Sequence, residues 1–272
     1  MAGTRLQTSP SADSRNTQIC VGEAGKGSVM RILESQSANA HILYDATALC
    51  GPVTPELFTR EYWQDREAIV GEAPGRGASL FLDPGDQACE SPAEGWVLRP
   101  YRRGGMVAKV SRQRYVWCGS TRTRAAREFR LTVMLHEQGL PVPQPIGACV
   151  WHTGLFYEGA LITARIPGAH TLADCIESSE DLPYTSLRAV GALIRKAHEI
   201  GLDHVDLNAR NLLLDRDGKP WIIDLDRCRI RNGHQWQARN MERLERSLTR
   251  FAPSRATGLM HEIRQGYLKP TP

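Results

Sequence analysis

The sequence lacks a long apolar segment that is free of both charge and proline. The longest stretch without a formal charge covers residues 138–157, and it contains Pro141, Pro143 and Pro145. Prolines at this density are incompatible with an ordinary membrane-spanning helix. The chain also begins without a charged region followed by an apolar one, so no secretory signal is expected.

Paired cysteine motifs are also missing. The seven cysteines are odd in number and scattered along the chain, and no C-x-x-C pair occurs. This absence removes support for a zinc site or a thioredoxin-like redox motif. The pattern therefore predicts reduced thiols in a cytosolic protein.

No internal repeat and no extreme of composition is present. Hydrophobic residues make up 41% of the 272 residues and charged residues 24%, which are ordinary values for a globular protein. A collagen-like, coiled-coil or wholly disordered chain is therefore excluded. The length allows one large domain or two small lobes, each with its own core.

Positive and negative charges nearly balance, since the net charge is only +4, but the basic residues are unevenly distributed along the chain. Residues 99–130 contain ten Lys and Arg and a single acid, Glu128. A second arginine-rich stretch covers residues 227–255. Such clusters suit phosphates, acidic sugars or an anionic lipid leaflet, and a solvated basic surface is the alternative.

Composition and periodicity divide the chain into three parts. Residues 1–40 are polar and rich in small side chains, which predicts a poorly ordered extension with one strand near residues 28–33. Residues 41–165 predict a β-rich lobe with a short helix over 55–65 and a long one over 120–138. Residues 166–272 predict a helical lobe with one hairpin over 212–223. One of its helices is marked by an apolar face that recurs every three or four residues, formed by Leu187, Val190, Ile194 and Ala197. The expected fold class is α+β.

The strongest chemical signal is a polar loop between a predicted helix and this hairpin. Residues 204–211 read His-Val-Asp-Leu-Asn-Ala-Arg-Asn, and Asp224 follows the next apolar strand. Asp206 precedes Asn211 by five residues, and Asp224 follows Asn211 by thirteen. This spacing is typical of the catalytic loop and the metal-binding aspartate of protein kinases. The alternative is a loop whose polar side chains only satisfy backbone amides.

Phosphoryl transfer requires these residue types. One carboxylate must accept the hydrogen bond of the acceptor hydroxyl, and Asp206 is the candidate catalytic residue. Mg²⁺ prefers hard oxygen ligands, which Asn211 and Asp224 supply. The sequence thus predicts ATP and Mg²⁺ as the cofactors. His204 is expected to be a structural hydrogen-bonding residue.

The other parts of a nucleotide site have weaker signals. Gly75 and Gly77 precede an apolar strand and are candidates for a phosphate-binding loop, although turns also use glycine freely. Glu128 lies in the middle of the predicted helix and can hold the cation that binds the phosphates; a surface carboxylate is the alternative. Two residues are candidates for that cation: Arg99, on a predicted strand, and Lys109.

These segments resemble the lipopolysaccharide kinases of Gram-negative bacteria, in particular those that act on 3-deoxy-D-manno-octulosonic acid (Kdo). The resemblance spans roughly residues 40–250. The matching stretches are Gly75-Arg-Gly-Ala, Val97-Leu-Arg-Pro-Tyr-Arg-Arg-Gly-Gly, Arg124-Ala-Ala-Arg-Glu-Phe-Arg-Leu, Gly139-Leu-Pro-Val-Pro-Gln-Pro, Ile166-Pro-Gly-Ala, His204-Val-Asp-Leu-Asn-Ala-Arg-Asn and Trp221-Ile-Ile-Asp-Leu-Asp-Arg.

The resemblance implies a bilobal protein-kinase-like fold with a β-rich N-lobe and a helical C-lobe. It implies transfer of the γ-phosphate of ATP to the 4-hydroxyl of Kdo on Kdo–lipid IVA, at the cytoplasmic side of the inner membrane. It also makes Asp206 the catalytic aspartate and Asn211 and Asp224 the metal ligands. Arg99 falls where kinases keep their strand lysine, which favours it over Lys109.

Three functions follow from these observations. The first is a sugar kinase whose partners are ATP, an acidic Kdo-containing glycolipid and, peripherally, an anionic membrane surface. The second is a heptose kinase or another sugar or small-molecule phosphotransferase of the same fold. The third is a non-catalytic nucleotide-binding or nucleic-acid-binding module. The chain keeps Asp206 and both metal ligands and has no known nucleic-acid-binding motif, so no nucleic acid partner is expected.

Overall fold

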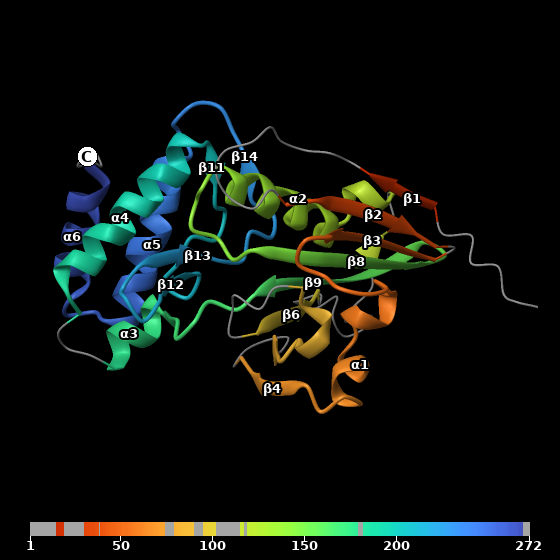
Figure 1. Cartoon of the computed structure of the whole chain (residues 1–272). Helices are drawn as coiled ribbons and strands as arrows, with labels where there is room; N and C mark the ends of the chain where they lie inside the picture. The colour runs from red at the N-terminus through yellow and green to blue at the C-terminus, as the bar shows by residue number, and fades with distance from the viewer. Residues whose placement is uncertain are drawn as a thin grey trace, which may run out of the picture.

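The computed structural model describes residues 15–18, 30–37, 39–73, 79–89, 95–101, 115–116, 119–178 and 182–268. The N-terminal half is an antiparallel sheet with helices packed on it, and the C-terminal half is mainly helical (Figure 1). The α+β class predicted from the sequence is confirmed. Within these ranges, no helix combines the length and the hydrophobicity that crossing a membrane requires.

The sheet joins strands from both ends of the N-terminal half, and every paired neighbour is antiparallel. In spatial order the strands are β1 (Arg15–Gln18), β2 (Ile32–Gln36), β3 (Ala40–Asp45), β8 (Pro145–Thr153), β9 (Phe156–Ala164), β6 (Trp96–Pro100), β5 (Leu80–Leu82) and β4 (Ile69–Glu72), while β7 (Tyr115–Val116) also pairs with β9. Strand β6 therefore lies beside β9, inside the sheet.

Alternating side chains of the central strands form two cores, one on each face of the sheet. Helix α2 (Arg124–Glu137) covers one face, where Phe129 packs with Leu43 and Leu161. The helical turn η1 (Pro55–Phe58) and helix α1 (Arg60–Gln64) cover the other face, where Trp63 is almost fully buried. The first face is the important one for function because α2 carries Glu128.

The C-terminal half is built from helices α3 (Leu172–Ser178), α4 (Tyr184–Glu199), α5 (Gln237–Phe251) and α6 (Ala256–Leu268). The short strands are β10 (His170–Thr171), β11 (Leu202–Asp203), β12 (Leu212–Leu214), β13 (Pro220–Ile222) and β14 (Arg229–Ile230). The predicted hairpin is confirmed, since β12 and β13 pair antiparallel. The predicted apolar face of α4 is also confirmed, because Leu187, Val190, Ile194 and Ala197 are all buried.

Most of the extension predicted over residues 1–40 lies outside the described residues. Within it, β1 pairs with β2 and β2 pairs with β3, and β2 overlaps the end of the strand predicted near residues 28–33. Met30 and Ile32 are 7% and 8% exposed, so two apolar side chains anchor this polar segment in the core. The helix predicted over 55–65 is two pieces, η1 and α1, because Thr59 adopts an extended conformation with φ −107° and ψ 153°.

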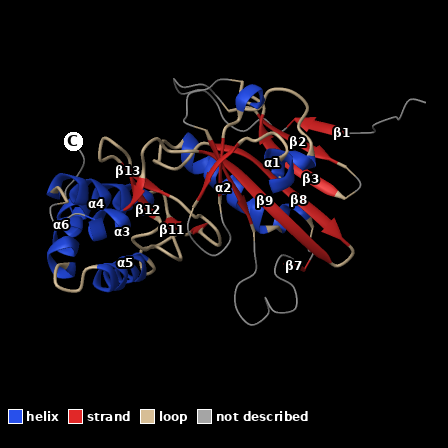
Figure 2. Ribbon diagram, turned by 90° about the horizontal axis from the view of Figure 1, so that it is seen from below, coloured by secondary structure: helices blue, strands red, loops and turns tan. Residues whose placement is uncertain are grey.

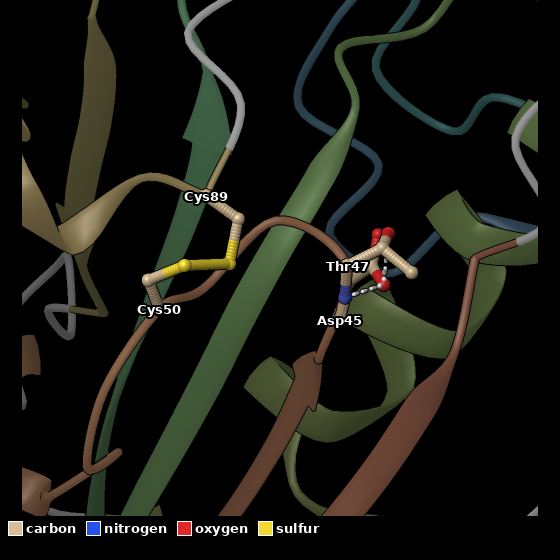
Figure 3. Close-up of a disulfide and its surroundings, with 4 residues drawn as sticks. All are labelled: Asp45, Thr47, Cys50 and Cys89. Carbon is tan, nitrogen blue, oxygen red and sulfur yellow. Dashed lines mark hydrogen bonds between the residues drawn. A yellow bond between two sulfur atoms is a disulfide. The ribbon is translucent and has the colours of Figure 1, made fainter.

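The prediction that all cysteines are reduced is wrong for one pair. Cys50 and Cys89 form a disulfide between the loops that follow β3 and β5 (Figure 3). Two backbone hydrogen bonds align these loops: the Cys50 amide donates to the Gln87 carbonyl at 2.9 Å, and the Cys89 amide donates to the Ala48 carbonyl at 3.0 Å. A pairing across 39 residues depends on the fold and leaves no local sequence pattern.

We expect Cys50→Ser to lower the free energy of unfolding by about 2–4 kcal/mol under oxidising conditions, because the open loop gains conformational freedom in the unfolded chain. The measurement is urea unfolding with and without a reductant. The wild type in reductant should match the variant. A variant as stable as the oxidised wild type would contradict the stabilising role of this bond.

Helices α4 and α6 approach so closely that glycine is required at the crossing. A Cβ atom on Gly266 would overlap the carbonyl oxygen of Arg188, which is backbone and cannot rotate away. Gly258, on the same helix α6, is exposed and has open space around it. The two glycines therefore form a matched pair.

We expect Gly266→Ala to lower the free energy of unfolding by about 1–3 kcal/mol or more, because the helices must move apart. Gly258→Ala should instead raise it by about 0.5–1 kcal/mol, because alanine favours the helix. Urea unfolding measures both. Equal changes in the two variants would argue against the close crossing.

Candidate active site

Three segments that are distant in the sequence meet at Arg99. This side chain extends from β6, and its Nη1 donates to Oδ1 of Asp224 at 2.6 Å. Its Nη2 donates to Oε1 of Glu128 on α2. One guanidinium group thus joins the sheet, the helix on the sheet and the C-terminal half. Burial alone would lower the pKa of Arg99, but Glu128, Tyr101 and Asp224 outweigh it and raise the pKa, so the group stays charged.

The carboxylate of Glu128 is buried, with only 4% of the side chain exposed. Its Oε1 accepts from Arg99 and from the Leu225 amide at 3.1 Å, and its Oε2 accepts from the hydroxyl of Tyr101. A buried carboxylate needs such donors, since the loss of hydration otherwise penalises the charged form. The burial excludes the alternative that Glu128 is a carboxylate on the helix surface.

Tyr101 also belongs to this group. Its contact with Glu128 was not predicted from the sequence. Its side chain is 5% exposed, and its ring centre lies 5.0 Å from the guanidinium carbon of Arg99. Burial raises the pKa of Tyr101 well above its usual value, and Glu128 adds to the effect, so the hydroxyl keeps its proton and can donate it. The available signal was the spacing of two residues from Arg99, which places both side chains on one side of an extended segment.

Helix α2 has a second attachment to the loop after Asp224. Nε of Arg124, the first residue of the helix, donates to Oδ1 of Asp226 at 2.8 Å. Together with the bond from the Leu225 amide to Glu128, this ion pair holds the first two turns of α2 against residues 225–226. The acidic side chain of Asp226 therefore has a structural partner in Arg124.

The loop over residues 204–211 is tied to the strand that leads into Asp224. Nε2 of His204 donates to the carbonyl of Ile223 at 3.0 Å, and the Ile223 amide donates to the carbonyl of Asn211 at 3.0 Å. Burial lowers the pKa of His204, against weaker opposing effects of Ile223 and Asp224. The ring is therefore neutral near pH 7 and donates a hydrogen bond within the protein.

Asp206 and Asn211 are joined inside this loop. Nδ2 of Asn211 donates to the backbone carbonyl of Asp206 at 2.9 Å, which leaves Oδ1 of the amide as the acceptor. Nδ2 of Asn208 donates to the same carbonyl at 2.9 Å, and its Oδ1 accepts from the Arg210 amide at 2.8 Å. Asp206 is exposed, and no side chain of the described residues bonds to its carboxylate. The carboxylate is thus available to a substrate.

The oxygens at this site fit a magnesium ion. Oδ1 of Asn211 and Oδ2 of Asp224 are hard oxygen ligands, and neither atom takes part in the hydrogen bonds described above. In the part of the chain that the structure describes, no three His, Cys, Asp or Glu side chains cluster as a metal site. A divalent cation held here would therefore complete its shell with water or substrate oxygens, as Mg²⁺ usually does.

The structure places five of the eight residues predicted for the site. It brings Arg99, Glu128 and Asp224 into direct contact. The Asn211 side chain bonds to the Asp206 carbonyl, and the Asn211 carbonyl accepts from the amide of Ile223, the residue before Asp224. The other three, Gly75, Gly77 and Lys109, fall outside the described residues.

Several known proteins that are similar to this chain carry the same name. A sequence model of the lipopolysaccharide kinase (Kdo/WaaP) family matches residues 60–267. A 3-deoxy-D-manno-octulosonic acid kinase of Xylella fastidiosa (strain 9a5c) is 40% identical over 221 residues, which cover 81% of this chain and 84% of that protein. Kinases of the same name from Stenotrophomonas maltophilia (strain R551-3) and Xanthomonas euvesicatoria pv. vesicatoria (strain 85-10) are 38% and 41% identical. They cover 84% and 79% of this chain, and 86% and 82% of their own lengths.

We expect Tyr101→Phe to lower the free energy of unfolding by about 1–3 kcal/mol, because the buried Glu128 loses one of its donors. Tyr62→Phe is the matched control, since the Tyr62 hydroxyl makes no hydrogen bond within the described residues, and its effect should stay within about 0.5 kcal/mol. Chemical unfolding measures both variants. Indistinguishable results would show that the bond between Tyr101 and Glu128 contributes nothing.

Proposed function

The chain belongs to the lipopolysaccharide kinase (Kdo/WaaP) family, and from that premise we propose that it transfers the γ-phosphate of ATP to the 4-hydroxyl of Kdo on Kdo–lipid IVA. Membership of the family makes the chain a kinase, a phosphotransferase of lipopolysaccharide biosynthesis. The observation that carries the proposal is the joining of Arg99, Glu128 and Asp224, next to a loop with the kinase spacing. The sheet and the helical half correspond, in this proposal, to the N-lobe and C-lobe of a protein-kinase-like fold.

Arg99 is the proposed ligand of the ATP phosphates. Its guanidinium is charged, and Glu128 holds it in one orientation at the place where the N-terminal and C-terminal halves meet. A planar guanidinium can bind phosphate oxygens with two parallel hydrogen bonds, whereas an ammonium acts as a point charge. Gly75 and Gly77 remain candidates for the phosphate-binding loop, and Lys109 for a second cation, on sequence alone.

Asn211 and Asp224 are the proposed Mg²⁺ ligands, through Oδ1 and Oδ2. When bound, the ion neutralises negative charge on the phosphates. The hydrogen bond from Asn211 to the Asp206 carbonyl fixes the amide so that its oxygen is the free atom. The bond between the Ile223 amide and Asn211 keeps the two ligands in one register across the loop and the strand.

Asp206 is the proposed catalytic residue. As the acceptor oxygen forms its bond to the γ-phosphorus, the bond from that phosphorus to the β-phosphate oxygen breaks, and ADP leaves. The proton of the acceptor hydroxyl passes to the Asp206 carboxylate. The exposure of Asp206 supports this role because a bulky glycolipid must reach the carboxylate from solvent.

The acceptor and its location are consistent with the charges of the chain. Kdo carries a carboxylate and the lipid carries phosphates, so basic segments favour this acceptor over a polycation. We place the enzyme peripherally at the cytoplasmic side of the inner membrane, held there by electrostatic attraction that salt weakens.

The test is transfer of labelled phosphate from ATP to Kdo–lipid IVA in mixed micelles with Mg²⁺. We expect the wild type to label Kdo. Because the proton acceptor is lost, Asp206→Ala should lower kcat by about 10²–10⁴. The free energy of unfolding should stay unchanged in this variant. Asp217→Ala, which removes an exposed aspartate from the β12–β13 turn, is the control and should leave kcat unchanged.

Wild-type turnover by folded Asp206→Ala would refute the role of Asp206. A wild type that binds ATP but does not label Kdo–lipid IVA would refute the proposed acceptor. In that case heptose-containing glycolipids and small sugars become the acceptors to assay.

A further inference from the structure

Helix α5 has a row of arginines along one face. They recur at intervals of four, three and four residues, which is the spacing of a single face of an α-helix. These residues are Arg239, Arg243, Arg246 and Arg250. The buried side chains of the helix, Asn240, Leu244 and Leu248, lie on the other side and hold α5 to the core.

The positive charge of this row is not neutralised within the described part of the chain. Arg239, Arg246 and Arg250 are exposed, Arg243 is half-buried, and none of the four forms an ion pair there. Glu242, which is exposed, lies three residues from Arg239 and four from Arg246 and forms no ion pair within the described residues, so four arginines face one unpaired acid. Glu245, the other acid of the helix, is paired with Arg264 of α6, with 2.8 Å between Oε2 and Nη2. The row therefore presents its charge to solvent.

The row borders the proposed catalytic loop. Oγ of Ser247 on α5 accepts a hydrogen bond from the Ala209 amide at 3.0 Å, and Ala209 lies between Asp206 and Asn211. The guanidinium carbons of Arg210 and Arg250 lie 5.1 Å and 6.0 Å from the ring centre of Phe251. Figure 2 shows α5 at the outer edge of the helical half. Exposed positive charge thus continues from the helix to the loop.

We propose that this surface docks the protein on an anionic lipid leaflet with the catalytic loop turned toward the headgroups. We call it the α5 arginine face and define it as Arg210, Arg239, Arg243, Arg246 and Arg250. The inference rests on the proposed function for the position of the acceptor, which is a glycolipid in that leaflet. It adds the surface of the protein that meets the membrane.

The geometry of the face favours a lipid surface over other anionic partners. Its four helical arginines lie along a straight line of about 16 Å, which suits a plane of phosphate groups. Guanidinium groups bind phosphates with paired hydrogen bonds. Phe251, the aromatic residue beside the face, is only partly exposed, and its ring is already stacked by Arg210 and Arg250. The face therefore lacks the open aromatic platforms that single-stranded nucleic acids need.

The experiment is co-sedimentation of the full chain with vesicles of phosphatidylethanolamine, with or without phosphatidylglycerol. The test variant carries Arg239→Gln, Arg243→Gln, Arg246→Gln and Arg250→Gln. The control variant has the same net charge but carries Arg31→Gln, Arg60→Gln, Arg66→Gln and Arg188→Gln, which lie outside α5 and the catalytic loop. All eight positions are at least partly exposed, and thermal unfolding checks that both variants fold.

We expect the test variant to bind anionic vesicles about 600-fold more weakly than the wild type, since each of the four arginines near such a surface contributes about a 5-fold effect. The control should change binding by less than about 5-fold, and added salt should weaken the wild type more steeply than the test variant. Two double variants, Arg239→Gln with Arg243→Gln and Arg246→Gln with Arg250→Gln, should each lose part of the affinity for anionic vesicles.

Sedimentation needs no turnover, so the outcome stands even if Kdo–lipid IVA is not the acceptor. If transfer occurs, the test variant should raise KM for acceptor in anionic vesicles and leave kcat unchanged in neutral detergent micelles. Vesicle binding equal to that of the wild type, equal losses in test and control, or loss of binding only to a polynucleotide would each overturn the proposal.

Discussion

The bridge that Arg99 makes between Glu128 and Asp224 is the interaction on which the rest of the site depends. Glu128 is buried on α2, and its charge is tolerated only because Arg99, Tyr101 and the Leu225 amide donate to it. Removal of the charged partner, Arg99, would leave an unpaired charge in a medium of low polarity, which typically costs about 3–5 kcal/mol. The same bridge sets how the sheet, α2 and the helical half meet.

Local hydrogen bonds transmit this arrangement to the catalytic loop. His204 and Asn211 both bond to Ile223, the residue before Asp224. Beneath the loop, Oδ1 of Asn240 on α5 accepts from the His204 amide at 3.1 Å, and Nδ2 of Asn240 donates to Asp203 at 3.1 Å. The loop therefore rests on α5, the helix that also carries the exposed arginine row. One helix supports the site internally and presents charge externally.

Secondary structure was predictable wherever periodicity was clear. The apolar spacing of α4, the strand β6 and the hairpin of β12 and β13 all followed from residue type and turn chemistry. The strands β1 and β4, of 4 residues each, and helix α3, of 7 residues, were missed because they are too short to show a clear periodicity, and they are held by neighbours in the sheet or core. The disulfide between Cys50 and Cys89 was missed for the same reason, since only the fold brings its loops together.

The sequence by itself determined the chemistry of the candidate site. Asp206, Asn211 and Asp224 are close enough along the chain for their spacing to carry a signal, and the resemblance to lipopolysaccharide kinases follows from such short segments. Only the tertiary structure decided which distant residues meet: Arg99 with Asp224 across 125 positions, and Arg124 with Asp226 across 102. Contacts over such separations arise from the packing of whole elements, and a linear pattern of residue types does not encode them locally.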